Sequence, residues 1–140
     1  MQISIRVADF SEFGGQLLNI RKAVFVEEQS VPVEIEIDGM DEASVHYIAQ
    51  DSTGKILGCG RLLPSGQIGR MAVLRSSRGS GIGFQLLEFI VTHALESNFK
   101  NLFLHAQTHA KNFYERAGFV THGDPFMEAG IEHVEMHYHR

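Results

Sequence analysis

A glycine-rich stretch near the middle of the chain has the residue pattern with the clearest chemistry. It follows a strand-like run, Gln67–Leu74, and leads directly into a helical stripe that begins at Ile82. The first backbone N–H groups of a helix have no partner inside it, and the helix dipole adds positive potential there. Glycines let a ligand approach the backbone, so the stretch predicts an anion-binding loop, to which Arg75 and Arg78 add charge. Its glycines are Gly79, Gly81 and Gly83.

Two familiar nucleotide-binding fingerprints do not fit this loop. It lacks the Gly-Lys-Ser/Thr ending of a P-loop, and its glycine spacing is not Gly-x-Gly-x-x-Gly. A purely structural turn before the helix is one alternative. Instead, Arg78-Gly79-Ser80-Gly81-Ile82-Gly83 resembles the Arg/Gln-x-x-Gly-x-Gly/Ala pyrophosphate loop of the GNAT-type N-acetyltransferases, which use acetyl-CoA. In that family the loop joins the fourth strand to the third helix.

A second block nearer the C-terminus supports the resemblance. The run from Asn112 to Phe119 resembles the Asn-x-x-Ala…Phe-Tyr-Glu-x-x-Gly-Phe block that follows the fifth strand in these enzymes. It departs from that pattern because Asn112 comes directly before Phe113-Tyr114. Looser matches extend the likeness over nearly the whole chain and resemble the ElaA/YjcF-like subgroup; they are Val24–Gln29, His105–Gln107 and Phe126–Ile131.

The resemblance implies a position for each part of acetyl-CoA. The backbone of Met71, Ala72 and Val73, on a strand that splays from its neighbour, would pair with the pantetheine arm and place the thioester. Asn112 would add a coenzyme contact. The pyrophosphate would be held by Arg78, Gly79, Ser80, Gly81, Ile82 and Gly83.

Direct transfer to an amine needs a neutral nucleophile, stabilisation of the tetrahedral oxyanion and a proton for the departing thiolate. The family resemblance makes Tyr114 the candidate general acid, since a phenol with an ordinary pKa near 10 is protonated at neutral pH. Packing against Phe113 is the alternative role for Tyr114. A backbone N–H near Val73 is the oxyanion donor that the family implies.

The sequence leaves the general base open between Glu28 and His105. Glu28 follows the first helix, and His105 ends the strand next to the cofactor strand. A structural or substrate-binding role remains an alternative for each residue, and a water molecule is another possible base.

Histidines alternate with apolar residues along the last predicted strand. Histidines two residues apart on a strand can share a metal ion, but an exposed polar face gives the same alternation. We expect no metal. The polar positions are His133, Glu135, His137 and His139.

The charge pattern bears on the partners. With a net charge of −5, the chain lacks the excess of basic residues that is typical of a general nucleic-acid binder, so we expect no nucleic-acid partner. Eight carboxylates and no basic residue lie between Ala23 and Gly54. A solvated acidic surface is one explanation; if the segment borders the acceptor cleft, as in the family, it would attract a cationic amine. Arg70, Arg75 and Arg78 are expected to gather around the phosphate loop.

The apolar pattern predicts one mixed sheet with helices packed on it, an α+β domain spanning residues 1–140. Alternation predicts a strand over 3–7, and three- and four-residue steps predict a helix from Phe10 with Ser11 as its N-cap. Residues 27–42 are expected to be irregular or briefly helical, and residues 123–130 are expected to form a loop. Further strands are expected at Val45–Gln50, Lys55–Leu63, Gln67–Leu74, Asn101–Ala106, Phe119–Thr121 and Ile131–His139, and further helices from Ile82 and over Thr108–Arg116. The resemblance implies about seven strands and about four helices, with a splay between the fourth and fifth strands.

These observations lead to one primary expectation: an acetyl-CoA-dependent N-acetyltransferase that acts on a primary amine, cationic before reaction. A coenzyme A or acyl-CoA binding module without catalysis and a small metal-binding protein are the alternatives. The lone Cys59 lies in a strand-like run and reads as a small buried hydrophobe.

No apolar run is long enough for a membrane span, so we expect a cytoplasmic protein without a membrane partner. The resemblance also allows a homodimer.

Overall fold

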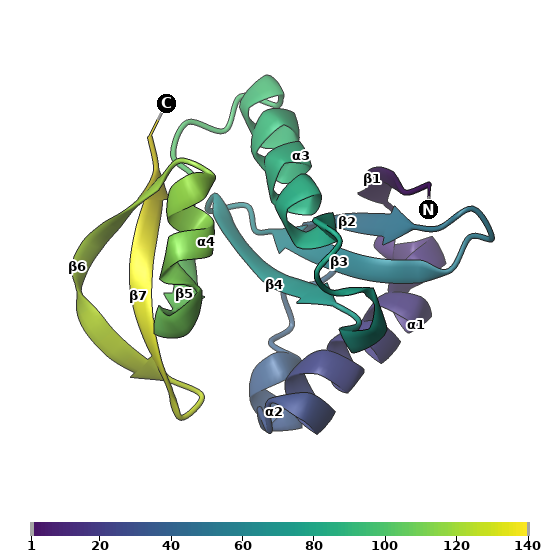
Figure 1. Cartoon of the computed structure of the whole chain (residues 1–140), viewed down its shortest axis with the longest axis horizontal. Coiled ribbons are helices and arrows are strands. Elements are labelled where there is room, and N and C mark those ends of the chain that lie inside the picture. The colour runs from purple at the N-terminus through teal and green to yellow at the C-terminus, as the bar shows by residue number, and fades with distance from the viewer. Residues whose placement is uncertain (1, 140) are drawn as a thin grey trace.

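A mixed sheet of seven strands, in the order β1-β2-β3-β4-β5-β7-β6, organises the chain (Figure 1). The computed structural model describes residues 2–139. The strands are β1 (Ser4–Ala8), β2 (Val45–Gln50), β3 (Ile56–Leu62), β4 (Gln67–Val73), β5 (Phe103–Gln107), β6 (Phe119–Glu128) and β7 (Ile131–Tyr138). Strands β2, β3 and β4 form an antiparallel meander, because both pairings within it are antiparallel.

The sheet splays between β4 and β5, the only parallel neighbours among the described strands. Their pairing covers Gln67 with Phe103 and Ile68 with Leu104, and the two strands then separate. Figure 1 shows the result: β5, β6 and β7 form one wing, while β1 to β4 form the other. This arrangement confirms the predicted mixed, mostly antiparallel fold with its splay.

Helices cover both faces of the sheet. The helices are α1 (Phe10–Arg21), α2 (Val33–Glu36), α3 (Ile82–Glu96) and α4 (Lys111–Arg116). Along β2, Tyr47 belongs to the core cluster that contains α3, whereas Ile48 belongs to the cluster that contains α1. Leu86 and Ile90 of α3 are fully buried, and each such side chain contributes about 1.5–3 kcal/mol through burial. No described helix has the length and apolar character needed to cross a membrane.

The start of α1 differs from the prediction. Asp9, and not Ser11, is the N-cap: the Asp9 carboxylate accepts a hydrogen bond from the Ser11 backbone N–H at 3.0 Å. The helix does not end at Arg21 but continues as a π-helix over Lys22–Glu28. Val24, four residues beyond Ile20, is buried on this continuation, so the three- and four-residue apolar period extends through it.

The largest error in the predicted elements concerns the stretch 123–130. It was expected to be a loop, yet β6 runs on to Glu128 and pairs with β7 along both halves. An irregularity in the register between His122 and Phe126 absorbs the intervening glycine, aspartate and proline.

Val7, expected on the buried face of β1, is 39% exposed. Cys59 is buried as predicted, and burial raises the pKa of its thiol to about 12.

Candidate active site

The splay leaves one edge of β4 without a strand partner. From Gly69 to Val73 the strand pairs with β3 on one side, but it has no register partner on β5 among the described residues. Arg70 lies in this segment with a φ of 50°, and the register with β3 shifts between Cys59 and Arg61. The open edge exposes the peptide groups that an extended ligand needs for strand-like pairing.

The glycine-rich loop leads from β4 into α3 and leaves the start of the helix uncapped. Gly79 and Gly81 have φ values of 85° and 84°, a left-handed conformation that favours glycine. Gly81 is the N-cap, and no side chain bonds to the first N–H groups of α3. Ser80 braces the loop by donating its hydroxyl to the Ser77 carbonyl at 2.8 Å. The terminus therefore presents free N–H donors and positive potential to an anion.

Arg78 links this loop to β4 and to the end of the first helix. Its Nε donates to the Val73 carbonyl at 3.0 Å. Its two terminal nitrogens donate to the carboxylate of Glu28 at 2.6 and 2.8 Å. The Arg78 hydrogen bonds lower the pKa of Glu28, while Arg75 approaches the same carboxylate at 3.6 Å. The structure thus places Glu28, one of the two candidate bases, with the arginines of the loop.

A cavity of about 480 Å³ lies where the two wings of the sheet separate. Met71 and Arg70 of β4 line one side, and His105 of β5 lines the other. Tyr114 of α4 also lines it, as does Glu128 of β6. Two of the predicted catalytic candidates, Tyr114 and His105, therefore face one space; Glu28 does not belong to its lining.

Tyr114 packs in an aromatic cluster beside this cavity. Its ring makes edge contacts with Phe113 and Phe119, at centroid distances of 5.1 and 6.3 Å. Burial raises the pKa of Tyr114 to about 12. Among the described residues, none hydrogen-bonds to its hydroxyl group. The side chain therefore combines the packing role with a free, protonated phenol. Asn112, on the same helix, is exposed.

His105 lies between two carboxylates. Its Nδ1 is 3.0 Å from Oε1 of Glu128, and its Nε2 is 3.4 Å from Oε1 of Glu135. The ring also makes an edge contact with Phe126, at a centroid distance of 5.0 Å. These contacts fix the imidazole at the cavity wall. The sequence pointed to His105 but not to Glu128 or Glu135 as its partners.

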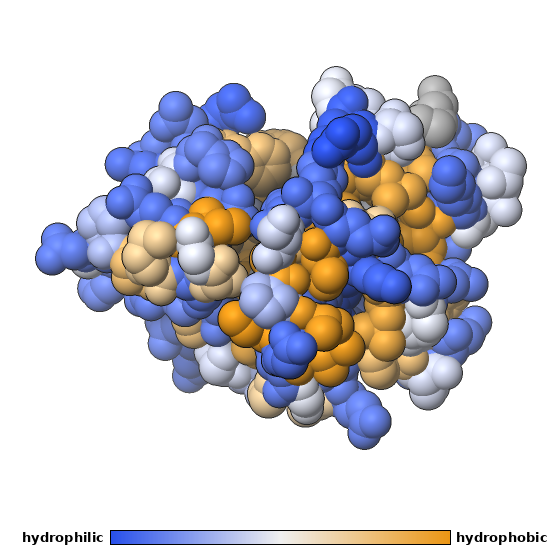
Figure 2. Space-filling model, turned by 90° about the horizontal axis from the view of Figure 1, so that it is seen from below, coloured by the Kyte–Doolittle hydropathy of each residue, from blue (hydrophilic) through white to orange (hydrophobic). Residues whose placement is uncertain are grey.

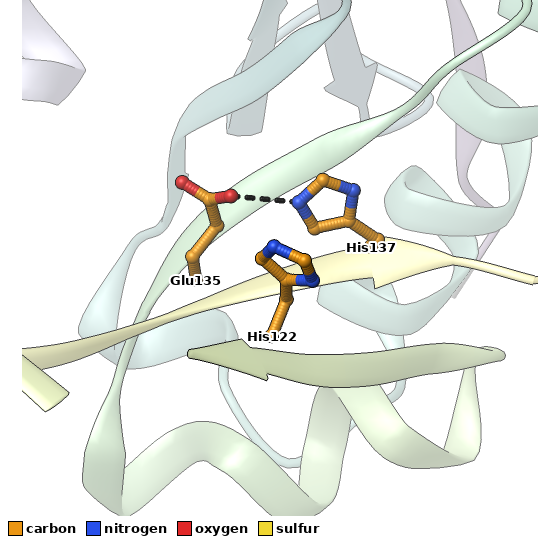
Figure 3. Close-up of side chains that lie close together, drawn as sticks. All are labelled: His122, Glu135 and His137. Carbon is orange, nitrogen blue, oxygen red and sulfur yellow. Dashed lines mark hydrogen bonds and ion pairs between the residues drawn. The ribbon is translucent and has the colours of Figure 1, made fainter. Parts of the chain in front are cut away.

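The predicted histidine-rich face of β7 divides between two environments. His133 is buried, and its Nδ1 lies 2.7 Å from the Ile131 carbonyl oxygen. Glu135 and His137 lie together, and His122 of β6 joins them (Figure 3). His139 is exposed beyond the end of β7. His122 is missing from the predicted group, because the short strand expected there, Phe119–Thr121, ends one residue before it.

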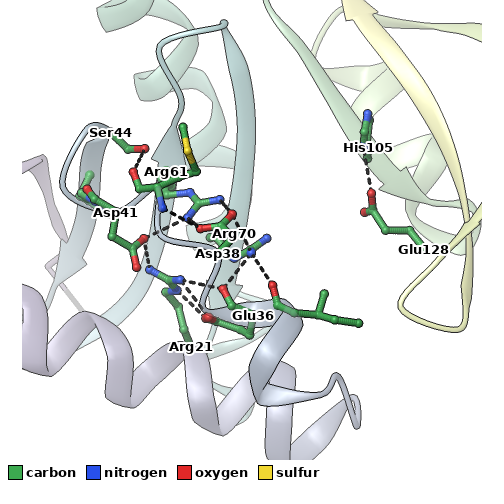
Figure 4. A network of polar contacts seen from close by, with 12 residues as sticks. Arg21, Glu36, Asp38, Asp41, Ser44, Arg61, Arg70, His105 and Glu128 are labelled. Atoms are coloured by element: carbon green, nitrogen blue, oxygen red, sulfur yellow. Dashed lines mark hydrogen bonds and ion pairs between the residues drawn. The ribbon is translucent and has the colours of Figure 1, made fainter.

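The acidic segment is not the free negative surface that its composition indicates. Arg21 donates to Glu36 at 2.6 and 2.9 Å and to Asp41 at 2.7 Å. Arg61 donates to Asp41 at 2.9 Å and to Asp38 at 2.8 Å (Figure 4). Three of the eight carboxylates are thus neutralised by arginines from α1 and β3.

Arg70 joins the same network, so its predicted place at the phosphate loop is wrong. Its Nη2 donates to the Glu36 carbonyl at 2.8 Å and lies 3.2 Å from Asp38. Burial opposes ionisation of Asp38, but hydrogen bonds from Arg61 and the Met40 backbone lower its pKa to about 2. The network ties α1, α2, β3 and β4 together beside the cavity. An arginine at position 61, inside an otherwise apolar strand, was the sequence signal for this pairing.

The entrance side of the cavity is partly apolar. Figure 2 shows apolar side chains gathered near the middle of the face that carries α2. Ile35, 48% exposed, lines the cavity, and its neighbours Val33 and Ile37 are 45% and 54% exposed. The cavity wall therefore combines apolar surface with the polar group around His105.

Comparisons with known proteins agree with this geometry. Residues 11–140 match the acetyltransferase (GNAT) domain family. The chain is 36% identical over 121 residues to the uncharacterized N-acetyltransferase YjcF of Bacillus subtilis, covering 84% of this chain and 86% of YjcF. It is 34% identical over 130 residues to ElaA of Escherichia coli, covering 86% of this chain and 83% of ElaA.

Solved structures have the same fold. A crystal structure of an acyl-CoA N-acyltransferase from Pseudomonas aeruginosa superposes with a TM-score of 0.88 at 30% identity, covering 99% of this chain and 100% of the other. The crystal structure of Escherichia coli ElaA gives a TM-score of 0.87 at 29% identity, with coverage of 97% and 99%. The chain belongs to the GNAT family of N-acetyltransferases, and within it to the ElaA/YjcF-like subgroup.

Proposed function

We propose that the protein transfers the acetyl group of acetyl-CoA directly to a primary amine, and that the acceptor molecule carrying this amine is cationic before the reaction. The observation that carries the proposal is the meeting of three features at the splay: the open edge of β4, the uncapped start of α3, and a cavity lined by Tyr114 and His105.

The coenzyme would lie along the first two features. The peptide groups of Met71, Ala72 and Val73 would pair with the pantetheine arm along this edge of β4, which has no strand partner among the described residues. The N–H groups from Ile82 onward would hold the pyrophosphate. Gly79, Ser80, Gly81 and Gly83 would form the rest of this loop, while Arg78 adds a positive charge and Asn112 a further polar contact. We infer that a β4 N–H near Val73 stabilises the oxyanion.

Tyr114 is the proposed general acid. The amine nitrogen forms a bond to the thioester carbonyl carbon, and collapse of the tetrahedral intermediate breaks the C–S bond. The departing thiolate then takes the phenolic proton. A pKa raised to about 12 keeps this phenol protonated at neutral pH, and water in the cavity returns the proton to it afterwards.

His105 is the better-supported candidate for the base that takes the proton from the ammonium group. It lines the cavity and is held by Glu128, whereas Glu28 is engaged by Arg78 and its pKa is lowered. A lowered pKa makes a carboxylate a weaker base.

Glu128, rather than the acidic segment, is the proposed attraction for a cationic acceptor. It lines the cavity, and its described polar partners are the histidines at 105 and 133. No described arginine or lysine neutralises it, unlike Glu36, Asp38 and Asp41. An acceptor ammonium group would therefore meet Glu128 beside His105.

A screen of amines, peptides and aminoglycoside-type compounds with acetyl-CoA, scored by release of free thiol, tests the function. Acceptor-dependent release with a mass gain of one acetyl group supports transfer. Binding of acetyl-CoA without release for any acceptor would instead indicate a binding module. A preference for neutral or anionic acceptors would overturn the proposal about charge.

Paired variants test the two acceptor-side residues. Glu128→Gln should raise KM for the amine far more than KM for acetyl-CoA, whereas Glu132→Gln, at an exposed position on β7, should change neither. His105→Gln should lower kcat. Unchanged kinetics in both variants would leave these residues as structural contacts.

A further inference from the structure

A cluster of three potential metal ligands lies on strands β6 and β7, outside the cavity lining. His122 of β6 is directly opposite Glu135 of β7, and His137 follows Glu135 by two residues on the same face. One ligand atom from each residue lies within 4.8 Å of the others. His137 Nε2 is 2.7 Å from Glu135 Oε2, and the two imidazole rings have centroids 4.6 Å apart (Figure 3).

We propose that His122, Glu135 and His137 form a binding site for a divalent transition-metal ion of the zinc type. Imidazole nitrogen and carboxylate oxygen are the ligands that such ions prefer, and two histidines with one carboxylate leave a fourth position for water. Metal–ligand distances near 2.0–2.2 Å place neighbouring ligand atoms roughly 3.3 Å apart. In the structure these ligand atoms lie within 4.8 Å of one another, so an ion would have to draw them closer.

The state of His122 supports a ligand at this position. Its side chain is exposed and makes no hydrogen bond to any described residue. It nevertheless stacks obliquely on His137, with 44° between the ring planes. Glu135 and His137 are both 34% exposed at their side chains, so an ion can reach all three residues from solvent.

Glu135 also connects the proposed metal site with the catalytic candidate His105. The same carboxylate that would bind the ion lies 3.4 Å from Nε2 of His105. An ion at the cluster would compete with His105 for this carboxylate. The metal proposal itself does not depend on the proposed catalysis, because it is tested by binding alone.

Titration of tag-free, metal-depleted protein with Zn²⁺ in a calorimeter tests the site directly. We expect one equivalent of Zn²⁺ to bind, and Mg²⁺ to give no heat because it prefers an all-oxygen shell. Co²⁺ should give visible absorption bands of a nitrogen- and oxygen-ligated ion. Absence of Zn²⁺ binding would overturn the proposal.

Variants then locate the ion. His122→Ala, His137→Ala and Glu135→Gln should each weaken Zn²⁺ binding about tenfold or more. His139→Ala, at an exposed histidine beyond the same strand, should leave it unchanged. Loss of binding only with His139→Ala, or equal affinity in every variant, would contradict the assignment. Thermal unfolding of each variant checks that the fold is retained, and Glu135→Gln preserves side-chain shape if an alanine variant is unstable.

Discussion

Glu28 accepts two hydrogen bonds from Arg78, a residue 50 positions later in the chain, at 2.6 and 2.8 Å. This ion pair joins the end of the first helix to the loop proposed to hold the pyrophosphate. In the structure the positive charge of Arg78 is therefore already paired. An incoming pyrophosphate would have to share or displace the Glu28 carboxylate.

The first prediction follows from this competition. Glu28→Gln should strengthen acetyl-CoA binding modestly, because it frees Arg78 for the pyrophosphate while the exposed ion pair that is lost contributes little by itself. Calorimetry with acetyl-CoA measures the change. If Glu28 were the general base, the same variant would instead lose kcat while its affinity for acetyl-CoA stayed constant, so kinetics on the variant separate the two roles.

The second prediction concerns the anion site. Gly81→Glu should abolish acetyl-CoA binding, since it puts a carboxylate against the helix start and forces a non-glycine residue to a φ of 84°. Gly54→Glu is the matched control, because Gly54 has a φ of 88° and open space around it but lies in the β2–β3 turn. Comparable affinity in the two variants would refute the loop as the pyrophosphate site.

The third prediction is specific to the proposed acid. Tyr114→Phe keeps the aromatic packing and removes the proton, so kcat should fall about 10²-fold or more in a chemistry-limited assay. Acetyl-CoA affinity should stay nearly constant. Tyr138→Phe provides the control, because Tyr138 packs on Phe119 without lining the cavity. If kcat does not change when the Tyr114 hydroxyl is removed, Tyr114 has a packing role only.

Local patterns predicted most of the fold. The four-residue spacing of Leu86, Ile90 and Ala94 predicts α3 correctly, because all three residues are buried. The glycine-rich loop was also found from its local context between a strand and a helix. The error at 123–130 has a local cause: glycine and proline indicate a turn, but pairing with β7 carries the strand past them.

Local sequence patterns do not predict which polar side chains pair with one another. Arg21 meets Glu36 and Asp41 only after α1, α2 and β3 have packed together, and the partners are 15 and 20 residues apart. The composition of the acidic segment therefore indicates a free negative surface, whereas in the folded protein arginines pair with Glu36, Asp38 and Asp41. His105 and Glu128 similarly become neighbours through the register of β5, β7 and β6.

The fourth prediction tests the stabilising effect of the buried arginines. Arg21→Met should lower the free energy of unfolding by about 3–5 kcal/mol, because it leaves the buried carboxylates of Glu36 and Asp41 without their main partner. Arg116→Met, at an exposed position of α4, should cost less than about 0.5 kcal/mol. Urea unfolding measures both. Equal effects would show that the network adds little to stability.

The last prediction concerns the pH dependence of that stability. The pKa of Asp38 is lowered to about 2 in the folded protein, against 3.8 for the ordinary group. A carboxyl group whose pKa is lowered by folding contributes its full stabilisation when the pH lies above its pKa in the unfolded chain. For Asp38 this contribution is lost as the pH falls from about 4 through 2. Asp38→Asn should therefore be less stable than the parent protein at pH 6, and the difference should narrow at pH 4 and again at pH 3.

Urea unfolding at these three pH values measures the narrowing, with Asp124→Asn as a control at an exposed position on β6. The control should follow the parent protein at each pH, because no described arginine or lysine pairs with Asp124. A gap between Asp38→Asn and the parent that stays constant from pH 6 to pH 3 would mean that the carboxylate charge of Asp38 is not what Arg61 and Arg70 stabilise. The effect of the variant would then lie in packing around α2 rather than in the ion pairs.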